Sequence, residues 1–315
     1  MHVLLTGGCG YVGTALTAKL LGSGIDVTVV DAQWFGNFLP PARGLRVIAE
    51  DVRNTDRIPL DGVDSVIHLA NVANDPCAEL DSKLSWEVNC LATMRLADRA
   101  ARSGVTQFIY ASSGSVYGVK SEEQVTEGLS TEPISDYNKT KMVSDRVVLS
   151  YSGDMLVQCI RPATVCGVSQ RMRLDLSVNL LTMQALTKGE ITVLGGDQTR
   201  PNIHIHDMVR TYLHFLTAGR QHTGVFNAGF ENMSILEIAR LVQEFVPAKI
   251  IIKPSMDPRS YRLNSDKLCA TGFGAEKLVK NAISEIKGAY RAGLLREDDR
   301  WYNIRWMKRQ QPIAA

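Results

Sequence analysis

The stretch TGGCGYVG, Thr6 to Gly13, decides the fold of this chain. Its glycines recur every third residue, directly after the apolar run MHVLL and at the start of a helical stretch. A lone glycine pattern is weak evidence, but Asp31 ends the next apolar run about twenty residues further on. That spacing places a diphosphate on the helix N-terminus and a carboxylate on an adenosine ribose.

Each glycine has its own physical task in such a cradle. Gly7 permits the tight turn, Gly10 lets the backbone approach the phosphates, and Gly13 lets helix and strand pack closely. Asp31 favours NAD over NADP, because its carboxylate accepts ribose hydroxyls and repels a 2′-phosphate. The pattern therefore predicts an NAD cradle, with a purely structural glycine turn as the alternative.

The first half of the chain alternates short apolar runs with helical stretches, which is typical of βαβ units. The apolar runs are continuous, as in parallel strands that are covered on both faces. We expect an α/β fold, a Rossmann-type doubly wound parallel sheet with a smaller C-terminal substrate-binding domain. The NAD-binding domain should span 1–166 and the substrate domain mainly 167–315, with about 200–229 returning to the first. Strands are expected at 2–7, 26–31, 45–51, 63–70, 107–113 and 156–163.

Composition and charge narrow the class of protein. The net charge is only +2 and opposite charges are interspersed, which predicts no nucleic-acid partner. No apolar run approaches the ~18 residues of a membrane span, and the start lacks the basic region of a signal peptide. The six cysteines show no CxxC pair and no histidine at ligand spacing. We therefore expect reduced thiols, no metal site, no membrane contact and a cytoplasmic location.

Tyr137 and Lys141 in SDYNKTK share one face of a predicted helix. Such a pair arises easily by chance, but here it follows the strand end ASSGSVYG, at the sheet edge where ligands bind. A phenolate base at neutral pH needs a pKa about 3 units below ~10, and an ammonium ~4 Å away supplies about that much. We predict Tyr137 as the base and Lys141 as its activating cation, helped by the positive nicotinamide ring. Ser113 is predicted as the hydroxyl that holds the substrate oxygen.

Taken in order, several motifs resemble the extended short-chain dehydrogenase/reductase superfamily. The nearest branch is the NAD-dependent epimerase/dehydratase family, which acts on nucleotide sugars and includes the UDP-glucose 4-epimerases. The resemblance spans nearly the whole chain and implies a homodimer formed through segments 85–100 and 137–151. Segments 168–186, 200–209 and 257–273 resemble more narrowly a subgroup that includes GDP-heptose 4-dehydrogenases. The motifs are TGGCGYVG, HLAN, ASSGSVYG, YNKTK, IRPATVCG and RPNIHIHD.

The resemblance also implies which residues hold the ligands. Arginines should hold the substrate diphosphate, since their planar fork matches phosphate geometry. Ser113 matches the catalytic serine of the epimerases, with Ser112 and Ser115 as near competitors. The implied substrate contacts are Ser113, Ser115, Thr164, Arg171, Arg173, Asn179, Arg200 and Arg259. The implied cofactor contacts are Gly7, Gly10, Tyr11, Val12, Gly13, Asp31, Ala32, Gln33, Trp34, Phe35, Gly36, Asp51, Val52, Leu69, Ala70, Asn71, Asn89, Tyr137, Lys141 and Ala163.

One departure from the family patterns narrows the predicted reaction. The 4,6-dehydratases carry an Asp-Glu pair after the catalytic hydroxyl residue, whereas Gly114 and Ser115 stand here and cannot transfer protons in that way. We therefore predict an NAD-dependent oxidoreductase acting at C4 of a nucleotide-diphosphate sugar, first of all a 4-epimerase. A net C4 dehydrogenase or ketoreductase stays open, as does a non-catalytic NAD-sensing protein.

Overall fold

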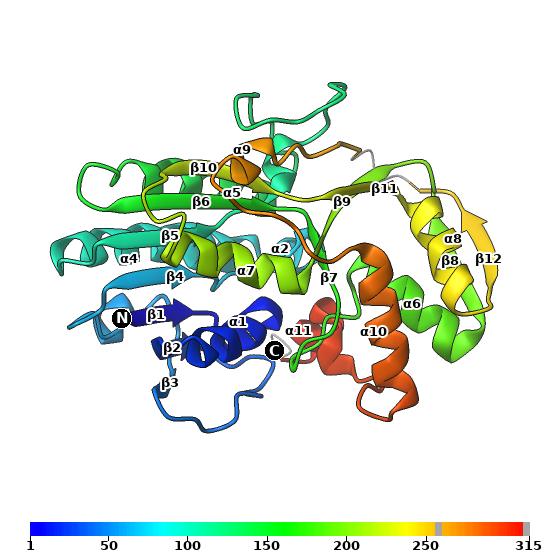
Figure 1. Cartoon of the computed structure of the whole chain (residues 1–315), viewed down its shortest axis with the longest axis horizontal. Helices are drawn as coiled ribbons and strands as arrows, with labels where there is room; N and C mark the ends of the chain where they lie inside the picture. Colours follow the sequence, from blue (N-terminus) through cyan, green and yellow to red (C-terminus); the bar gives the residue numbers. More distant parts are fainter. Residues whose placement is uncertain (256–259, 311–315) are drawn as a thin grey trace.

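A seven-stranded sheet forms the centre of the computed structural model, which describes residues 1–255 and 260–310. All neighbouring strands in it are parallel, in the order β10-β6-β5-β4-β1-β2-β3 (Figure 1). The order reverses between β1 and β4, which is where such sheets bind their ligands. This arrangement confirms the expected α/β fold. The strands are β1 (His2–Thr6), β2 (Asp26–Asp31), β3 (Leu45–Ala49), β4 (Ser65–His68), β5 (Gln107–Ala111), β6 (Leu156–Pro162) and β10 (Gly224–Ala228).

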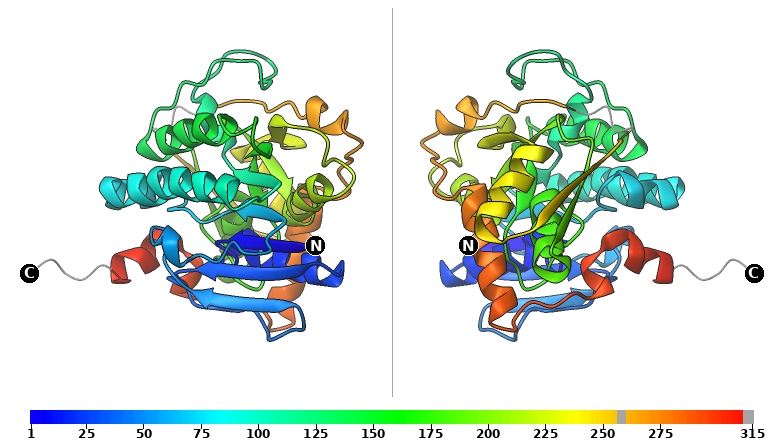
Figure 2. Two further views of the ribbon diagram at one scale, coloured as in Figure 1. Left: turned by 90° about the vertical axis from the view of Figure 1, so that its left-hand side faces the viewer. Right: turned by 90° about the vertical axis from the view of Figure 1, so that its right-hand side faces the viewer.

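Helices cover both faces of this sheet (Figure 2). Leu4 and Leu5 of β1 are both fully buried, but they point to opposite faces and belong to separate apolar cores. Leu5 packs in the core that contains α1 and α7, and Leu4 in the core that contains α4 and α5. Strands buried on both sides account for the continuous apolar runs. The helices are α1 (Tyr11–Gly22), α7 (Ile205–Leu216), α4 (Ala92–Arg102) and α5 (Asp136–Leu149).

A third apolar core lies beside the sheet, at the right of Figure 1. It is built from three helices and a pair of parallel strands, with Val178, Ile191 and Ile283 among its buried residues. A three-stranded sheet, in the order β11-β9-β7, runs between this core and the larger sheet. The elements are β7 (Thr164–Cys166), α6 (Ser177–Lys188), β8 (Glu190–Leu194), β9 (Thr199–His204), β11 (Glu231–Ser234), α8 (Ile235–Phe245), β12 (Lys249–Lys253) and α10 (Val279–Arg291).

The shorter elements lie mainly in the connections. A wider π-helical segment, η2 (Glu87–Leu91), lies directly before α4. Such segments occur mostly at functional sites. In the two described ranges, no helix combines the length and the apolar character that crossing a membrane requires. The remaining elements are η1 (Thr55–Arg57), α2 (Asp75–Leu80), α3 (Ser82–Trp86), η3 (Gly114–Tyr117), α9 (Asp266–Cys269), η4 (Asp299–Trp301) and α11 (Asn303–Gln310).

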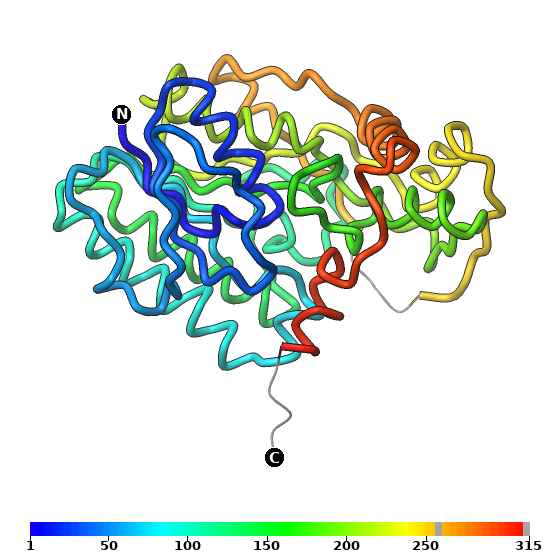
Figure 3. The backbone as a smooth tube through the Cα atoms, turned by 90° about the horizontal axis from the view of Figure 1, so that it is seen from below, coloured from blue at the N-terminus to red at the C-terminus, as the bar shows by residue number. Residues whose placement is uncertain are grey.

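The segment that contains η4 and α11 crosses back to the larger sheet (red in Figure 3). The indole Nε1 of Trp306 donates to the carbonyl oxygen of Trp34 at 2.6 Å. The amide of Leu174 donates to the carbonyl oxygen of Trp301 at 2.8 Å. The segment therefore touches two loops, one that follows β2 and one that precedes α6.

Candidate active site

A cavity of about 540 Å³ opens at the carboxyl ends of the parallel strands. It collects residues that follow β1, β2, β4, β5 and β6, and it brings most of the predicted site together. These segments are far apart in the sequence, but parallel strands end at one edge of the sheet. The predicted residues that line it are Gly7, Gly10, Tyr11, Val12, Gly13, Asp31, Ala32, Trp34, Phe35, Gly36, Asp51, Val52, Leu69, Ala70, Asn71, Ser113, Ser115, Tyr137, Lys141, Ala163, Thr164, Arg171, Arg173 and Arg200.

The glycine cradle has the form that a diphosphate requires. Gly10 is the N-cap of α1 and no side chain caps this helix, so its first amide groups remain available to a ligand. A Cβ atom at Gly13 would lie 2.3 Å from the carbonyl oxygen of Gly7, which leaves no room for one. A Cβ atom at Gly10 would meet only that same oxygen, at 3.2 Å. Gly13 therefore serves packing, and the space beside Gly10 suits the cofactor.

Asp31 ties this cradle to the end of β2. Its Oδ2 accepts the amide hydrogen of Cys9 at 2.9 Å, and its Oδ1 accepts that of Gln33 at 2.7 Å. Burial raises the pKa of Asp31, while these two backbone hydrogen bonds act in the opposite direction. Each carboxylate oxygen keeps a further lone pair, so Asp31 can also accept ribose hydroxyls. The residues present therefore fit an NAD molecule.

Tyr137 and Lys141 lie on one face of α5 and both line the cavity. Lys141 is 1% exposed, and its Nζ donates to the carbonyl oxygen of Ala111 at 2.7 Å. The same Nζ lies 6.0 Å from the centroid of the Tyr137 ring. The ammonium is thus fixed between the end of β5 and the phenol.

Burial shifts the pKa values of both groups toward their neutral forms. It raises the pKa of Tyr137 to about 12, and the negative charge of Asp75 adds to the shift. Burial also lowers the pKa of Lys141 to about 7, although Asp145 acts in the opposite direction. Desolvation therefore favours the neutral phenol, and the predicted phenolate depends on the nicotinamide charge as well as on Lys141, as the sequence analysis expects. Additional positive charge is needed beside the phenol.

A chain of polar groups leads from Asn138 through Ser115 and Ser113 toward the Tyr137 phenol. The Oγ atoms of Ser113 and Ser115 lie 2.7 Å apart, and Ser115 donates to Oδ1 of Asn138 at 2.5 Å. A side-chain hydrogen bond from Ser113 lowers the pKa of Tyr137. Ser113 is thus the serine of this cluster that faces the phenol.

Two acidic residues of the cavity wall, Asp75 and Asp175, were missed by the sequence analysis. Asp75 begins α2, accepts a hydrogen bond from Ser135 and lies close enough to Tyr137 to raise its pKa. Asp175 pairs with Arg173 through two hydrogen bonds of 3.0 and 2.9 Å. The run Asn74-Asp75-Pro76 carries the signal of a helix start, but nothing in it indicates a neighbour in α5.

Arg173 and Arg200 line the cavity, as expected for substrate contacts. The ion pair with Asp175 raises the pKa of Arg173 despite its burial. The Nη1 of Arg200 lies 3.3 Å from the carbonyl oxygen of Thr199. Arg259 lies outside the residues that the structure describes.

Three predicted site residues, Gln33, Asn89 and Asn179, do not line the cavity. Asn89 is buried and its Oδ1 accepts the amide hydrogen of Val72 at 2.7 Å. Asn179 is buried behind the cradle, where its Oδ1 accepts the amide hydrogen of Gly167 at 3.0 Å. Both asparagines hold loops of the cavity wall from behind.

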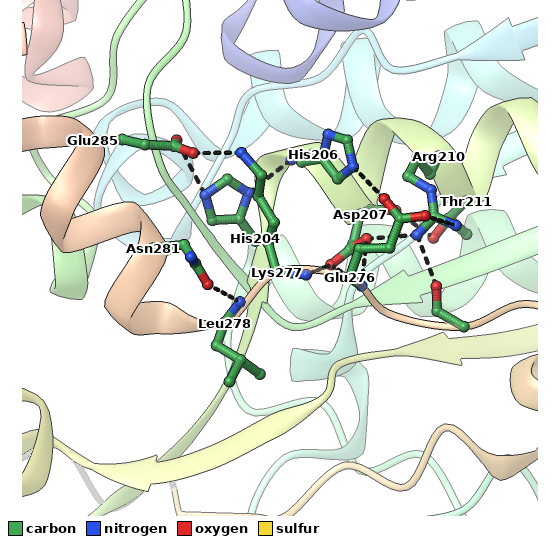
Figure 4. Close-up of polar contacts among 11 residues, drawn as sticks. His204, His206, Asp207, Arg210, Thr211, Glu276, Lys277, Leu278, Asn281 and Glu285 are labelled. Carbon is green, nitrogen blue, oxygen red and sulfur yellow. Dashed lines mark hydrogen bonds and ion pairs between the residues drawn. The ribbon is translucent and has the colours of Figure 1, made fainter.

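A cluster formed by His206, Asp207 and Glu276 has its ligand atoms within 4.8 Å of one another (Figure 4). Asp207 already accepts the amide hydrogens of Glu276 and Lys277, and Nη1 of Arg210 donates to it at 2.8 Å. Nη2 of Arg210 lies 2.8 Å from Glu276. The guanidinium supplies the positive charge between these acids, and the cluster joins α7 to the segment before α10.

Comparison with known proteins places these features in a wider context. A model of the NAD dependent epimerase/dehydratase family matches residues 3–229. The UDP-glucose 4-epimerase of Corynebacterium glutamicum is 26% identical over 295 residues, 85% of this chain and 88% of that protein. The uncharacterized protein y4nG of Sinorhizobium fredii is 33% identical over 209 residues, 65% of this chain and 50% of that protein.

A solved structure resembles nearly the whole chain. MoeE5 in complex with UDP-glucuronic acid and NAD superposes with a TM-score of 0.83 at 26% identity. The match covers 93% of this chain and 100% of that chain. The likeness therefore includes both the larger sheet and the elements beside it.

Proposed function

The chain belongs to the NAD-dependent epimerase/dehydratase family, and from this premise we propose that it is a 4-epimerase of a nucleoside diphosphate sugar. The family confirms NAD as the cofactor that the cradle and Asp31 predict. One observation carries the proposal: Ser113, Tyr137 and Lys141 share a cavity with the glycine cradle. The relatives support the substrate class, since one is a UDP-glucose 4-epimerase and another binds UDP-glucuronic acid.

The proposed chemistry divides the work among three side chains. When bound, NAD accepts a hydride from C4 of the sugar and returns it. Tyr137 takes the proton of the C4 hydroxyl as the ketone forms, and gives it back on reduction. Ser113 donates a hydrogen bond to the same oxygen, and Lys141 stabilises the phenolate. Reduction from the other face of the ketone yields the epimer.

Two further observations favour a 4-epimerase within this family. Gly114 and Ser115 follow the catalytic serine, so these positions hold no carboxyl group to drive loss of water. The segment with η4 and α11 contacts Trp34, which lines the cavity beside Asp31. Such a contact at the wall of the cofactor site would help to retain NAD, as suits an enzyme that regenerates it in each turnover.

The decisive experiment follows both redox state and sugar identity. The protein is incubated with NAD and, in turn, UDP-glucose, UDP-glucuronic acid and GDP-, CDP- and dTDP-sugars. Interconversion of C4 epimers without net reduction supports the proposal. Steady accumulation of NADH indicates a net C4 dehydrogenase instead.

The variant Tyr137→Phe tests the catalytic assignment. Loss of the base should lower turnover by about 10²–10⁴-fold, while NAD still binds. Turnover that survives this change removes Tyr137 from the mechanism. Binding of NAD with no turnover of any sugar by the unaltered protein indicates an NAD-sensing protein.

We also propose a homodimer through α4 and α5. Leu91, just before α4, is 44% exposed, and Met94 within it is 40% exposed. A partner helix pair would cover these apolar side chains. Sedimentation at micromolar concentration should show a dimer, and Leu91→Lys together with Met94→Lys should give a monomer. A monomeric unaltered chain contradicts the proposal.

A cytoplasmic location is the remaining proposal. All six cysteines are free thiols, and five of them are buried. Free thiols are the rule in reducing compartments. Fractionation of the native host, with the protein followed by antibody, tests this location.

A further inference from the structure

The side chain of Arg171 lies in the part of the cavity formed by the loop that follows Asp31. Its guanidinium carbon stacks 4.1 Å from the centroid of the Phe35 ring, in the loop that follows Asp31. Only 1% of Arg171 is exposed, although the residue lines the cavity. The sequence led us to expect this arginine among the substrate contacts, but its neighbours belong to the cofactor side.

The loop that carries Arg171 is fastened to the glycine cradle. The hydroxyl of Tyr11 donates to the carbonyl oxygen of Gly167 at 2.7 Å. The hydroxyl of Ser169 donates to the carbonyl oxygen of Tyr11 at 2.7 Å and lies 2.8 Å from the hydroxyl of Thr14. These bonds hold the loop against the first turn of α1, so Arg171 reaches from that turn toward Phe35.

Nη2 of the Arg171 guanidinium is hydrogen-bonded, whereas its Nε has no partner among the described residues. Its Nη2 donates to Oδ1 of Asn303 at 2.5 Å and to the carbonyl oxygen of Arg300 at 3.3 Å. Its Nε is buried and has no hydrogen-bond partner in the part of the chain that the structure describes. A buried donor without a partner is costly, and more so on a cation.

The charged groups near Arg171 also favour the binding of an anion beside it. Burial lowers the pKa of Arg171 to about 9, and the like charge of Arg173 adds to the shift. Asp175 and Asp31 act in the opposite direction. Asp175 pairs directly with Arg173, and Asp31 is engaged by the amides of Cys9 and Gln33. Arg171 has no comparable carboxylate partner among its described contacts.

We propose that Arg171 binds the diphosphate of the dinucleotide cofactor, opposite the amide groups at the start of α1. A planar fork matches two phosphate oxygens, and an anion there would satisfy Nε and the buried charge together. The inference depends on NAD binding and is independent of the sugar reaction proposed above. The diphosphate of the nucleotide sugar is the rival source of the same chemistry.

Binding experiments separate the two sources without measuring turnover. Calorimetric titrations of the full chain use ADP-ribose, adenosine and UDP as probes. Arg171→Met should weaken the binding of ADP-ribose by about tenfold or more and that of adenosine by less than about twofold. The affinity for UDP should not change. Arg171→Lys, which keeps the charge and loses the fork, should fall between. Arg200→Met is the matched control, because it removes a cavity arginine predicted to hold the sugar nucleotide.

Two results overturn the inference. One is that Arg171→Met binds ADP-ribose with an affinity within about twofold of that of the unaltered protein. The other is that this variant loses affinity for UDP alone. Thermal unfolding of each unliganded variant checks that it is folded. If the methionine variant does not fold, Arg171→Lys and Asn303→Ala decide by the same criterion. A protein that turns over no sugar but shows the ADP-ribose loss contradicts only the proposed function.

Discussion

Tyr137 illustrates how a single residue depends on its ligand for its chemistry. Burial raises its pKa to about 12, Asp75 adds to the shift, and the hydrogen bond from Ser113 only partly offsets it. Lys141 is itself shifted to a pKa of about 7 by burial, so its charge is only partly present at neutral pH. An oxidised nicotinamide brings a further positive charge, and a nearby opposite charge favours the phenolate.

Cofactor binding should therefore lower the pKa of Tyr137. In a spectrophotometric titration, the phenolate absorbance lost in Tyr137→Phe should appear near pH 12 without cofactor, and at lower pH with NAD. NADH, whose ring is neutral, is the matched control and should produce a smaller shift. Equal titration curves with NAD and NADH contradict the role assigned to the ring's charge.

At the scale of elements, Gly10 and Gly13 at the start of α1 have different physical tasks. Gly13→Ala places a Cβ atom 2.3 Å from the carbonyl oxygen of Gly7 and should destabilise the fold by about 1–3 kcal/mol. Gly10→Ala meets that oxygen at 3.2 Å and should fold, but its methyl group occupies space that suits the phosphates. Urea denaturation and NAD titration of both variants check this pair. The prediction fails if Gly10→Ala is the less stable variant, or if it binds NAD normally.

The elements around this turn are the part of the fold that the sequence predicts best. The six expected strands match β1 to β6. Most of these strands are buried on both faces and leave continuous apolar runs, whereas the edge strand β3 is only partly buried. The helix predicted to carry Tyr137 and Lys141 is α5, and Ser135 is its cap. The π-helical segment before α4 was not predicted, since widening of one turn depends on packing.

At the scale of the whole molecule, contacts between distant segments escaped the sequence analysis. Arg171 and Asn303 meet across 132 positions, and their residue types carry no code for this contact. The same is true of Asn89, which was expected at the cofactor but holds the amide of Val72. Motifs located the cradle and the pair Tyr137 and Lys141, whereas packing decided which polar residues face the cavity.

The contact between β9 and α10 should make the free energy of unfolding depend on pH. Nε2 of His204 lies 3.2 Å from Oε2 of Glu285, and its proximity lowers the pKa of Glu285 to about 2. Burial opposes this shift, and Lys277 adds to it. A carboxyl whose pKa is depressed on folding stabilises the protein above its ordinary pKa of 4.5 and loses this effect as pH falls toward 2. Glu285→Gln should therefore flatten the fall in unfolding free energy between about pH 5 and 2.5. An unchanged slope contradicts the assignment.

The contact between the segment that contains α11 and the loop that follows β2 should slow the release of NAD. Trp306 donates from its indole to the carbonyl oxygen of Trp34, whereas Trp301 donates to Arg296 within its own segment at 3.1 Å. Trp306→Phe removes the first hydrogen bond and keeps an aromatic ring, and Trp301→Phe does the same to the second. A net contribution of about 0.5–1.5 kcal/mol per bond predicts NAD dissociation about two- to tenfold faster in Trp306→Phe alone. Competition stopped-flow measures both rates. Equal dissociation rates in the two variants mean that α11 contacts the loop without retaining NAD. The contact with Trp34 then gives no support to an epimerase over a dehydrogenase.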